Sequence, residues 1–400
     1  MTHLTRAVLS TIILSLIVLQ SISTSDSYAR ELTPLEAGSL PVASTNFMIA
    51  DEHASLTDSD IDNYLIGETR LFWQDRYIAD LLAYPEAAWS FNITVPDHEE
   101  LYGHISNEEL TVTSFVTYPT EVIDNPRPYD FPYHNSAYGS FQHMLMPGEQ
   151  PKISKARDKY PLIVLSHGGS AHGVYDIGHA NDLASQGYIV AVIMYGDNRN
   201  LKLFGNNEHR TYLRPLITKA VVDSLIKSPT FGSYIEADNV GISGHSFGGF
   251  TALASAGAKA GGEPNASTDP RTKAIVLAAP WVGRTHDGET YYAFGDENES
   301  LKNITIPTIS FVATKDDITT PESILPAMKL LNGPTYVIEL VDQPHTFEDG
   351  SWRDRNNWEI IFFNAHLKDD KAAQALLKEG TSMNGGNVDR QLMEYQRLPE

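Results

Sequence analysis

The chain contains no cysteine among its 400 residues, so neither a disulfide bond nor a lipid-modified cysteine anchor can form. Basic side chains are also scarce, since 29 Lys and Arg face 51 Asp and Glu, a formal net charge of −22. Such an excess of negative charge repels nucleic acid and anionic membranes, so we expect neither as a partner. A chain of this length buries enough apolar surface to fold without cross-links.

The sequence patterns of bound cofactors are missing as well. The 14 histidines show no His-x-His or His-Glu-x-x-His spacing, and no phosphate loop or dinucleotide fingerprint occurs. We therefore expect no metal and no cofactor. The sequence carries no signal for an oligomeric state. The partner we expect is a substrate, either a small molecule or a polymer.

The longest apolar run lies near the N-terminus, at residues 7–19. Arg6 precedes this run, and Ser27-Tyr28-Ala29 places small residues at the two positions that a signal peptidase recognises. The run is short for a transmembrane helix. We predict a signal peptide at residues 1–29, cleaved after Ala29, and export to the periplasm or the medium without stable membrane insertion. The alternative is an uncleaved N-terminal anchor.

The rest of the chain divides by composition into three segments, which we predict to be an N-terminal extension (30–105), a catalytic domain (106–370) and a C-terminal helix with a polar tail (371–400). The first part of the extension, to about residue 60, is polar and predicts a loose lead-in. Residues 61–84 have a mixed apolar periodicity that favours a helix.

The predicted catalytic domain alternates short apolar runs with amphipathic segments of helical length. An early alternating run at 110–118 predicts an antiparallel strand. The apolar runs that predict buried strands are 162–165, 188–194, 240–242, 274–277, 308–312 and 336–340. The segments that predict helices are 213–226, 324–331, 352–367 and 371–378. This alternation predicts an α/β fold with a mostly parallel central sheet and helices on both faces.

One motif suggests the chemistry. Gly244-His245-Ser246-Phe247-Gly248 follows a short apolar strand and precedes a helix of small residues. This is the pattern of a nucleophile elbow, in which a serine is exposed at a tight turn from strand to helix. The turn crowds strand against helix, so side chains at Gly244 and Gly248 would collide with the backbone. The alternative is an ordinary Gly-Ser turn.

A serine nucleophile needs a histidine as base and a carboxylate that orients the histidine. In parallel-sheet hydrolases both follow later strands, in the order serine, acid, histidine. Here Asp316 and Asp317 follow the strand predicted at 308–312, and His345 follows the last predicted strand. We favour Asp316, because Ile318 would then return the loop to the core, and Asp317 is the alternative.

The negative oxygen that forms when serine attacks a carbonyl needs two backbone donors. One expected donor is the N–H of Phe247, directly after the nucleophile. The other should come from residues 166–170, which follow the first strand of the predicted parallel sheet. We choose Gly169, because a glycine lets the backbone approach the substrate closely. The alternative for these residues is a plain tight turn.

These motifs resemble the α/β-hydrolase superfamily, and within it the group similar to dienelactone hydrolases, platelet-activating-factor acetylhydrolases and cutinases or polyesterases. The resemblance covers residues 111–371 approximately. It implies a triad of Ser246, Asp316 and His345, with Gly169 and Phe247 as the oxyanion donors. It also places Trp281 beside the acyl group of the substrate, the alternative being a buried core tryptophan. This chain differs from dienelactone hydrolases in its serine nucleophile and from polyesterases in having Phe247 where they usually have Met.

From the residues and the resemblance we expect an exported serine carboxylic-ester hydrolase that acts through an acyl-enzyme on short-to-medium acyl esters, with polyesters among the candidate substrates. A serine peptidase or amidase is one alternative, although the N-terminal region is too short for the propeller domain common in such relatives. A non-catalytic binding protein with a hydrolase fold is another. We expect the loops at 125–140, 172–179 and 197–210 to border the pocket.

Overall fold

A computed structural model of the chain describes residues 30–33, 35, 38–45, 89–103, 108–133, 136–145, 148–169, 171, 173–197, 203–260, 268–286, 289–348, 350–383 and 388–399. The predicted signal peptide (1–29) and the predicted helix at 61–84 lie outside these residues. Among the described residues, no helix has the length and apolar character needed to cross a bilayer.

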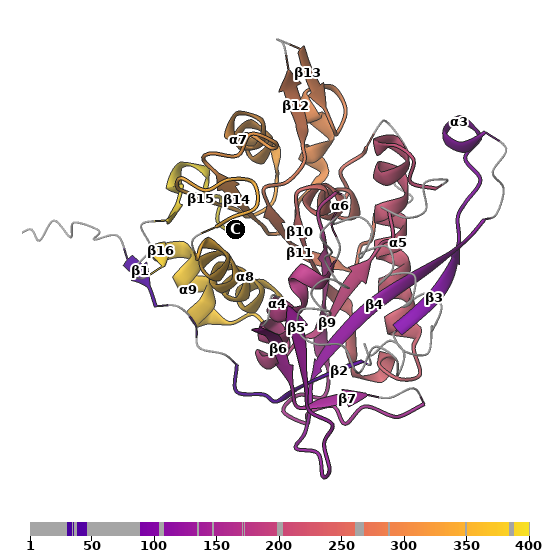
Figure 1. The fold of residues 1–400 in the computed structure, drawn as a ribbon. Coiled ribbons are helices and arrows are strands. Elements are labelled where there is room, and N and C mark those ends of the chain that lie inside the picture. The colour runs from indigo at the N-terminus through magenta and orange to yellow at the C-terminus, as the bar shows by residue number, and fades with distance from the viewer. Residues whose placement is uncertain are drawn as a thin grey trace, which may run out of the picture.

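An 11-stranded sheet forms the centre of the described structure (Figure 1). Its order is β17-β15-β14-β11-β10-β8-β9-β4-β2-β7, and β3 also pairs with β4. The strands are β2 (Val42–Thr45), β3 (Trp89–Thr94), β4 (Glu109–Pro119), β7 (His143–Leu145), β8 (Tyr160–Ser166), β9 (Ile189–Met194), β10 (Ile235–His245), β11 (Thr272–Ala278), β14 (Thr308–Ala313), β15 (Thr335–Leu340) and β17 (Asp389–Gln391).

The strands from β9 through β15 in this order are parallel to their neighbours. β4 and β17 flank this parallel block, and both run antiparallel to it. The mostly parallel sheet predicted from the sequence is confirmed. Because parallel strands end at one edge, the segments that follow β8, β10, β11, β14 and β15 are brought together there.

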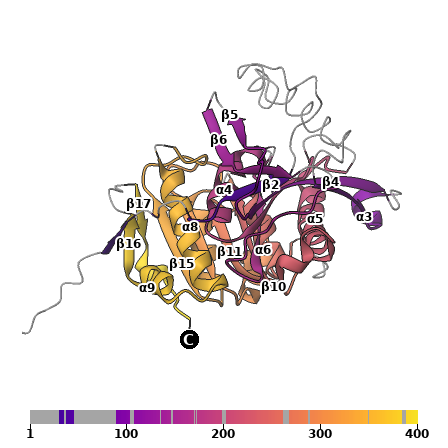
Figure 2. The ribbon, with the colours of Figure 1, turned by 90° about the horizontal axis from the view of Figure 1, so that it is seen from below.

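Helices cover both faces of the sheet, as the sequence predicts (Figure 2). One face packs against α4 (Ile177–Ser185), α8 (Ser351–Leu367) and α9 (Lys371–Glu379). The other packs against α5 (Asn207–Lys227), α6 (Phe247–Ser255) and α7 (Pro321–Leu330). Successive residues of one strand serve opposite faces: Ile163 and Leu165 pack in the first core, whereas Leu162 and Val164 pack in the second. This two-sided burial explains why the strands are continuous apolar runs.

Both ends of the chain contribute more structure than the sequence predicts. Within the predicted loose lead-in, β1 (Arg30–Leu32) pairs with β16 (Gly380–Met383), and β2 joins the central sheet. Within the predicted polar tail, β17 pairs with β15. These strands have three or four residues, too few to show a hydrophobic period, so tertiary pairing decides their conformation.

The segment expected to be a long loop at 125–140 also differs from the expectation. It contains β5 (Tyr129–Tyr133), which pairs with β6 (Ser136–Phe141) in a two-stranded sheet of its own. Proline such as Pro132 disfavours the interior of a sheet, but every strand of a two-stranded sheet is an edge strand, where proline is tolerated. A second hairpin, β12 (Gly283–His286) with β13 (Glu289–Tyr292), projects at the top of Figure 1.

Candidate active site

Ser246 occupies the turn between β10 and α6, with φ 54° and ψ −116°. A positive φ is strained for a residue with a side chain, and such strain persists where the surrounding structure enforces it. The surroundings here are backbone: a Cβ on Gly244 would lie 2.2 Å from the carbonyl carbon of Gly248, and a Cβ on Gly248 would lie 1.9 Å from the oxygen of Ser166. The glycines of the motif are therefore a steric requirement of this turn.

Backbone hydrogen bonds tie Ser246 to the end of β11. The Ser246 N–H donates to the carbonyl oxygen of Ala278 over 2.8 Å, and the Trp281 N–H donates to the carbonyl oxygen of Ser246 over 2.9 Å. Trp281 is half-buried and packs against the core that contains α6. The side chain of Trp281 therefore packs on the core, while its backbone is bonded directly to the serine.

Asp316 and His345 lie in contact, from the loops that follow β14 and β15. Oδ2 of Asp316 is 2.7 Å from Nδ1 of His345, and both side chains are buried. Since a carboxylate accepts, Nδ1 carries the proton in this pair, and neutral His345 has Nε2 free as a proton acceptor. Ser246 and His345 show no hydrogen bond between their side chains in the described residues. In free enzymes such contacts are often long and tighten when substrate binds.

Ile318 does not return this loop to the core, so the reason given for preferring Asp316 over Asp317 is wrong. Ile318, the expected apolar anchor, is 47% exposed, and Asp317 is exposed too. The fully buried residue of this loop is Thr319. The carboxylate of Asp316 turns the chain inward by accepting hydrogen bonds from the N–H groups of Ile318 and Thr319, each 2.8 Å long.

Thr319 also supports the acid through its side chain. Its hydroxyl lies 2.7 Å from Oδ2 of Asp316 and 3.0 Å from the carbonyl oxygen of Ala279. Burial raises the pKa of Asp316, but the hydrogen bonds from His345 and Thr319 outweigh burial, so the pKa lies below its ordinary value of 3.8. Asp316 is therefore ionised at neutral pH. No motif in the sequence indicated Thr319.

His245, the residue before the serine, contacts the loop of His345. Its Nε2 lies 2.8 Å from the backbone carbonyl oxygen of His345, and the two rings are 4.8 Å apart. Burial and the neighbouring His345 lower the pKa of His245 to about 3, so its ring is neutral and donates from Nε2. In the sequence, His245 stands at a variable position of the Gly-x-Ser-x-Gly motif, which gives no sign of this contact.

The two expected oxyanion donors lie side by side. A Cβ on Gly169 would be 3.6 Å from Cβ of Phe247, and a Cβ on Gly168 would be 3.5 Å from Cβ of Ser246. Phe247 is the first residue of α6, where backbone N–H groups have no partner within the helix and favour negative charge. Gly169 is exposed. The loop after β8 therefore passes directly over the serine.

Within the described residues, no group of three or more His, Asp or Glu side chains is arranged to hold a metal ion. The side chains gathered at this site can transfer protons and attack as a nucleophile. A serine at an elbow, a buried Asp–His pair and two backbone N–H groups close to the serine are the parts that acyl transfer requires.

One comparison identifies a related family. Residues 132–205 match the family model of platelet-activating factor acetylhydrolase, isoform II. The matched segment includes β8, the loop at 166–169 and β9, and it ends before Ser246. The match agrees with the acetylhydrolase-like resemblance that the motifs indicated, and it supports a hydrolase of the esterase type. A search of curated proteins found no match.

Proposed function

We propose that this chain is a serine carboxylic-ester hydrolase with Ser246, His345 and Asp316 as its catalytic triad. The observation that carries the proposal is the Asp316–His345 pair, 2.7 Å apart, at the same sheet edge as a serine held at φ 54°. A buried carboxylate in contact with a histidine, close to a serine, is the arrangement that serine hydrolases of unrelated folds share.

In the first half of the proposed reaction, Ser246 Oγ attacks the ester carbonyl carbon while Nε2 of His345 takes its proton. Asp316 keeps the proton of His345 on Nδ1 and stabilises the imidazolium that forms. The carbonyl oxygen becomes an oxyanion, to which the N–H groups of Phe247 and Gly169 donate. His345 then returns the proton to the leaving alcohol, and the acyl group stays on Ser246.

In the second half, water takes the place of the alcohol. His345 removes a proton from the water as the water attacks the acyl carbon, and the same two N–H groups hold the oxyanion. Breakdown of this intermediate breaks the bond to Oγ and returns the proton to Ser246, releasing the carboxylic acid.

We assign Trp281 to the acyl side of the substrate, since its backbone is bonded to Ser246 and its side chain is partly exposed. Short-to-medium acyl esters are the proposed substrates, and polyesters are included because the partly exposed ring of Trp281 suits an aromatic acyl group. We propose that the protein is exported, supported by the signal-peptide pattern of residues 1–29, and N-terminal sequencing of the protein recovered outside the cell tests this.

The experiment that tests the proposal is covalent labelling of the nucleophile. A fluorophosphonate reacts with an activated serine by losing fluoride, and the adduct resembles the tetrahedral intermediate. We expect one adduct per chain, located by peptide mass spectrometry on Ser246 and absent after heat denaturation. An adduct on another serine, or none on the folded protein, would contradict the proposal.

A further inference from the structure

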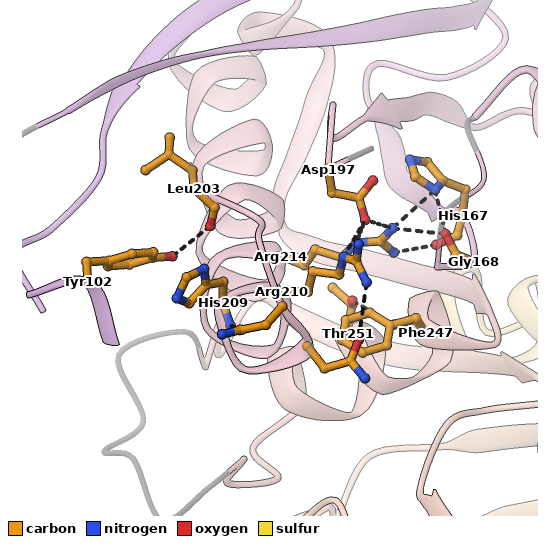
Figure 3. A network of polar contacts seen from close by, with 12 residues as sticks. Tyr102, His167, Gly168, Asp197, Leu203, His209, Arg210, Arg214, Phe247 and Thr251 are labelled. Atoms are coloured by element: carbon orange, nitrogen blue, oxygen red, sulfur yellow. Dashed lines mark hydrogen bonds and ion pairs between the residues drawn. The ribbon is translucent and has the colours of Figure 1, made fainter. Parts of the chain in front are cut away.

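A fully buried arginine lies beneath the proposed oxyanion donors. Arg214, on α5, is 0% exposed, and so is its ion-pair partner Asp197 (Figure 3). Nη2 and Nε of Arg214 donate to Oδ2 of Asp197 over 2.5 and 3.1 Å. The same guanidinium donates to two backbone carbonyl oxygens of the loop after β8, from Nη1 to His167 over 2.6 Å and from Nη2 to Gly168 over 2.9 Å.

Burying this ion pair is costly, because removing two charges from water costs several kcal/mol per ion and apolar residues of similar volume often stabilise a protein better. Burial raises the pKa of Asp197, but Arg214 outweighs burial, so the pKa lies below 3.8 and the pair stays ionised. Stability alone therefore gives no reason for Arg214 at this position. Its hydrogen bonds suggest a reason, since the planar fork of a guanidinium fixes several acceptors at once.

The bond to Gly168 constrains Gly169. The carbonyl of Gly168 and the N–H of Gly169 belong to one planar trans peptide unit, so they point in opposite directions. With the Gly168 oxygen directed into the protein toward Arg214, the Gly169 N–H is directed away from the buried guanidinium. Gly169 lies on the exposed side, next to Phe247.

Arg214 also contacts the other donor residue. Its guanidinium carbon lies 5.2 Å from the centroid of the Phe247 ring, within the range of a cation–π interaction. The Phe247 ring stacks on Phe250 at 5.0 Å, and the Phe247 carbonyl accepts a hydrogen bond from the Thr251 hydroxyl (Figure 3). One side chain thus touches Phe247 and the carbonyl end of the Gly168–Gly169 peptide, whose N–H is the other proposed oxyanion donor.

We propose that Arg214, held by Asp197, is a positioning residue that orients the Gly168–Gly169 peptide and so sets the oxyanion hole. The inference rests on the proposed function, because it assigns a role in stabilising the transition state of that reaction. Arg214 touches no reacting atom and acts only through Gly168 and Phe247.

Two variants test this role. Arg214→Lys keeps the charge opposite Asp197, but a single ammonium cannot replace the fork that reaches both carbonyls. The double variant Arg214→Gln with Asp197→Asn removes both charges together and leaves no unpaired buried ion. Arg210→Gln is the matched control: Arg210 Nε lies 3.8 Å from Asp197 Oδ2, on the same helix, but Arg210 makes no hydrogen bond to the carbonyls of His167 or Gly168 among the described residues. Circular dichroism and thermal unfolding establish that each variant is folded.

The readout compares two substrates that differ in one atom, an ester and its thionoester (C=S in place of C=O) with the same acyl and leaving groups. Sulfur is a weak hydrogen-bond acceptor, so the oxyanion hole accelerates the thionoester much less. Since one oxyanion donor contributes about 10²–10³ in kcat, we expect both test variants to lose about 100-fold in kcat on the ester, with little change in KM. On the thionoester we expect a loss of less than about threefold, because its reaction depends little on the donors.

A fall of the ester-to-thionoester ratio in either folded test variant, with the ratio unchanged in Arg210→Gln, is the expected result. Equal losses on both substrates, or no loss on either, would overturn the positioning role and leave Arg214 a purely structural residue. Failure of the proposed function is a separate outcome. In that case the wild-type protein would turn over neither substrate, or Ser246→Ala would hydrolyse both as fast as wild type.

Discussion

The backbone carbonyl oxygen of His345 lies 2.8 Å from Nε2 of His245, the residue directly before Ser246. The loop of His345, the proposed base, is thus bonded to the residue before Ser246, the proposed nucleophile. Both residues also follow strands that end at the same edge of the sheet. Trp352 of α8 packs on the same imidazole, with ring centroids 5.9 Å apart. The position of His345 relative to Ser246 therefore depends on the side chain of His245.

Replacing His245 with Leu removes this tether. A buried carbonyl that loses its donor costs about 1–3 kcal/mol, and the loop of His345 has freedom to shift. We expect kcat for ester hydrolysis to fall about tenfold or more, with KM changed little and the protein folded. Steady-state kinetics measure both constants, and wild-type kcat in folded His245→Leu would show that the tether has no catalytic importance.

The two neighbouring aspartates provide a matched pair. Asp316→Asn removes the negative charge that contacts His345, and we expect kcat to fall by about 10³–10⁴, as expected when the triad histidine is left in the wrong tautomer. Asp317→Asn changes an exposed side chain and should leave kcat within about twofold of wild type. The reverse ranking of the two variants would assign the acid to Asp317.

Three histidines, His167 buried and His245 and His366 half-buried, predict sensitivity to acid. Burial is the largest cause that lowers the pKa of each, to about 4 for His167, about 3 for His245 and about 4 for His366. Because these values lie below that of an unfolded histidine, about 6.5, the unfolded chain binds protons first as the pH falls. The stability they contribute is complete above about pH 6.5 and is lost progressively toward pH 4.

His366 allows this acid sensitivity to be measured away from the active site. It contacts the rings of Tyr336 and Phe362, and its Nε2 is buried without a hydrogen-bond partner among the described residues. Between pH 6 and 4.5, we expect the free energy of unfolding of His366→Leu to fall less steeply with pH than that of wild type. The expected difference between the two slopes is about 1.4 kcal/mol per pH unit. Urea unfolding across this range measures the slope. A slope equal to that of wild type contradicts the prediction, and ester hydrolysis at pH 8 serves as the control.

Trp281 tests the assignment of the acyl side. Trp281→Ala keeps the backbone bond to Ser246 but removes the ring, so we expect kcat/KM for aromatic or medium-chain acyl esters to fall about tenfold while acetate esters change about twofold or less. Assays on a series of acyl lengths with one leaving group measure this difference. Equal losses across the series would place the ring in the core and not in the substrate site.

Much of the architecture was predictable because it depends on local patterns. Strands buried on both faces are continuous apolar runs. The elbow needs Gly244 and Gly248 for steric reasons, and this requirement leaves a glycine pattern that is visible in the sequence. The short strands β1, β2, β16 and β17 were not predictable, because their conformation depends on pairing with distant segments. The hairpin of β5 and β6 was missed because Pro132 argues against a strand unless the strand is known to lie at an edge.

The candidate site also contains residues that the sequence predicts and residues that it does not. Ser246, Asp316 and His345 were predictable because each directly follows a predicted strand, and the fold places the ends of those strands at one edge of the sheet. The supporting residues Thr319 and Arg214 each make several hydrogen bonds to carboxylate and carbonyl oxygens. Such bonds join residues from different loops and helices and leave no periodic signal in the sequence.

The central claim is that Ser246 is the nucleophile of an ester hydrolase, and its most direct test is the hydrolysis of p-nitrophenyl esters of increasing acyl length by wild type and Ser246→Ala, assayed together. We expect wild type to turn over and Ser246→Ala to lose at least about three orders of magnitude in kcat while unfolding at the same temperature. A p-nitroanilide with the same acyl group, assayed alongside, should react far more slowly if the enzyme is an esterase and not an amidase. Equal activity of the two proteins, or a folded wild type inactive on every ester, would contradict the account.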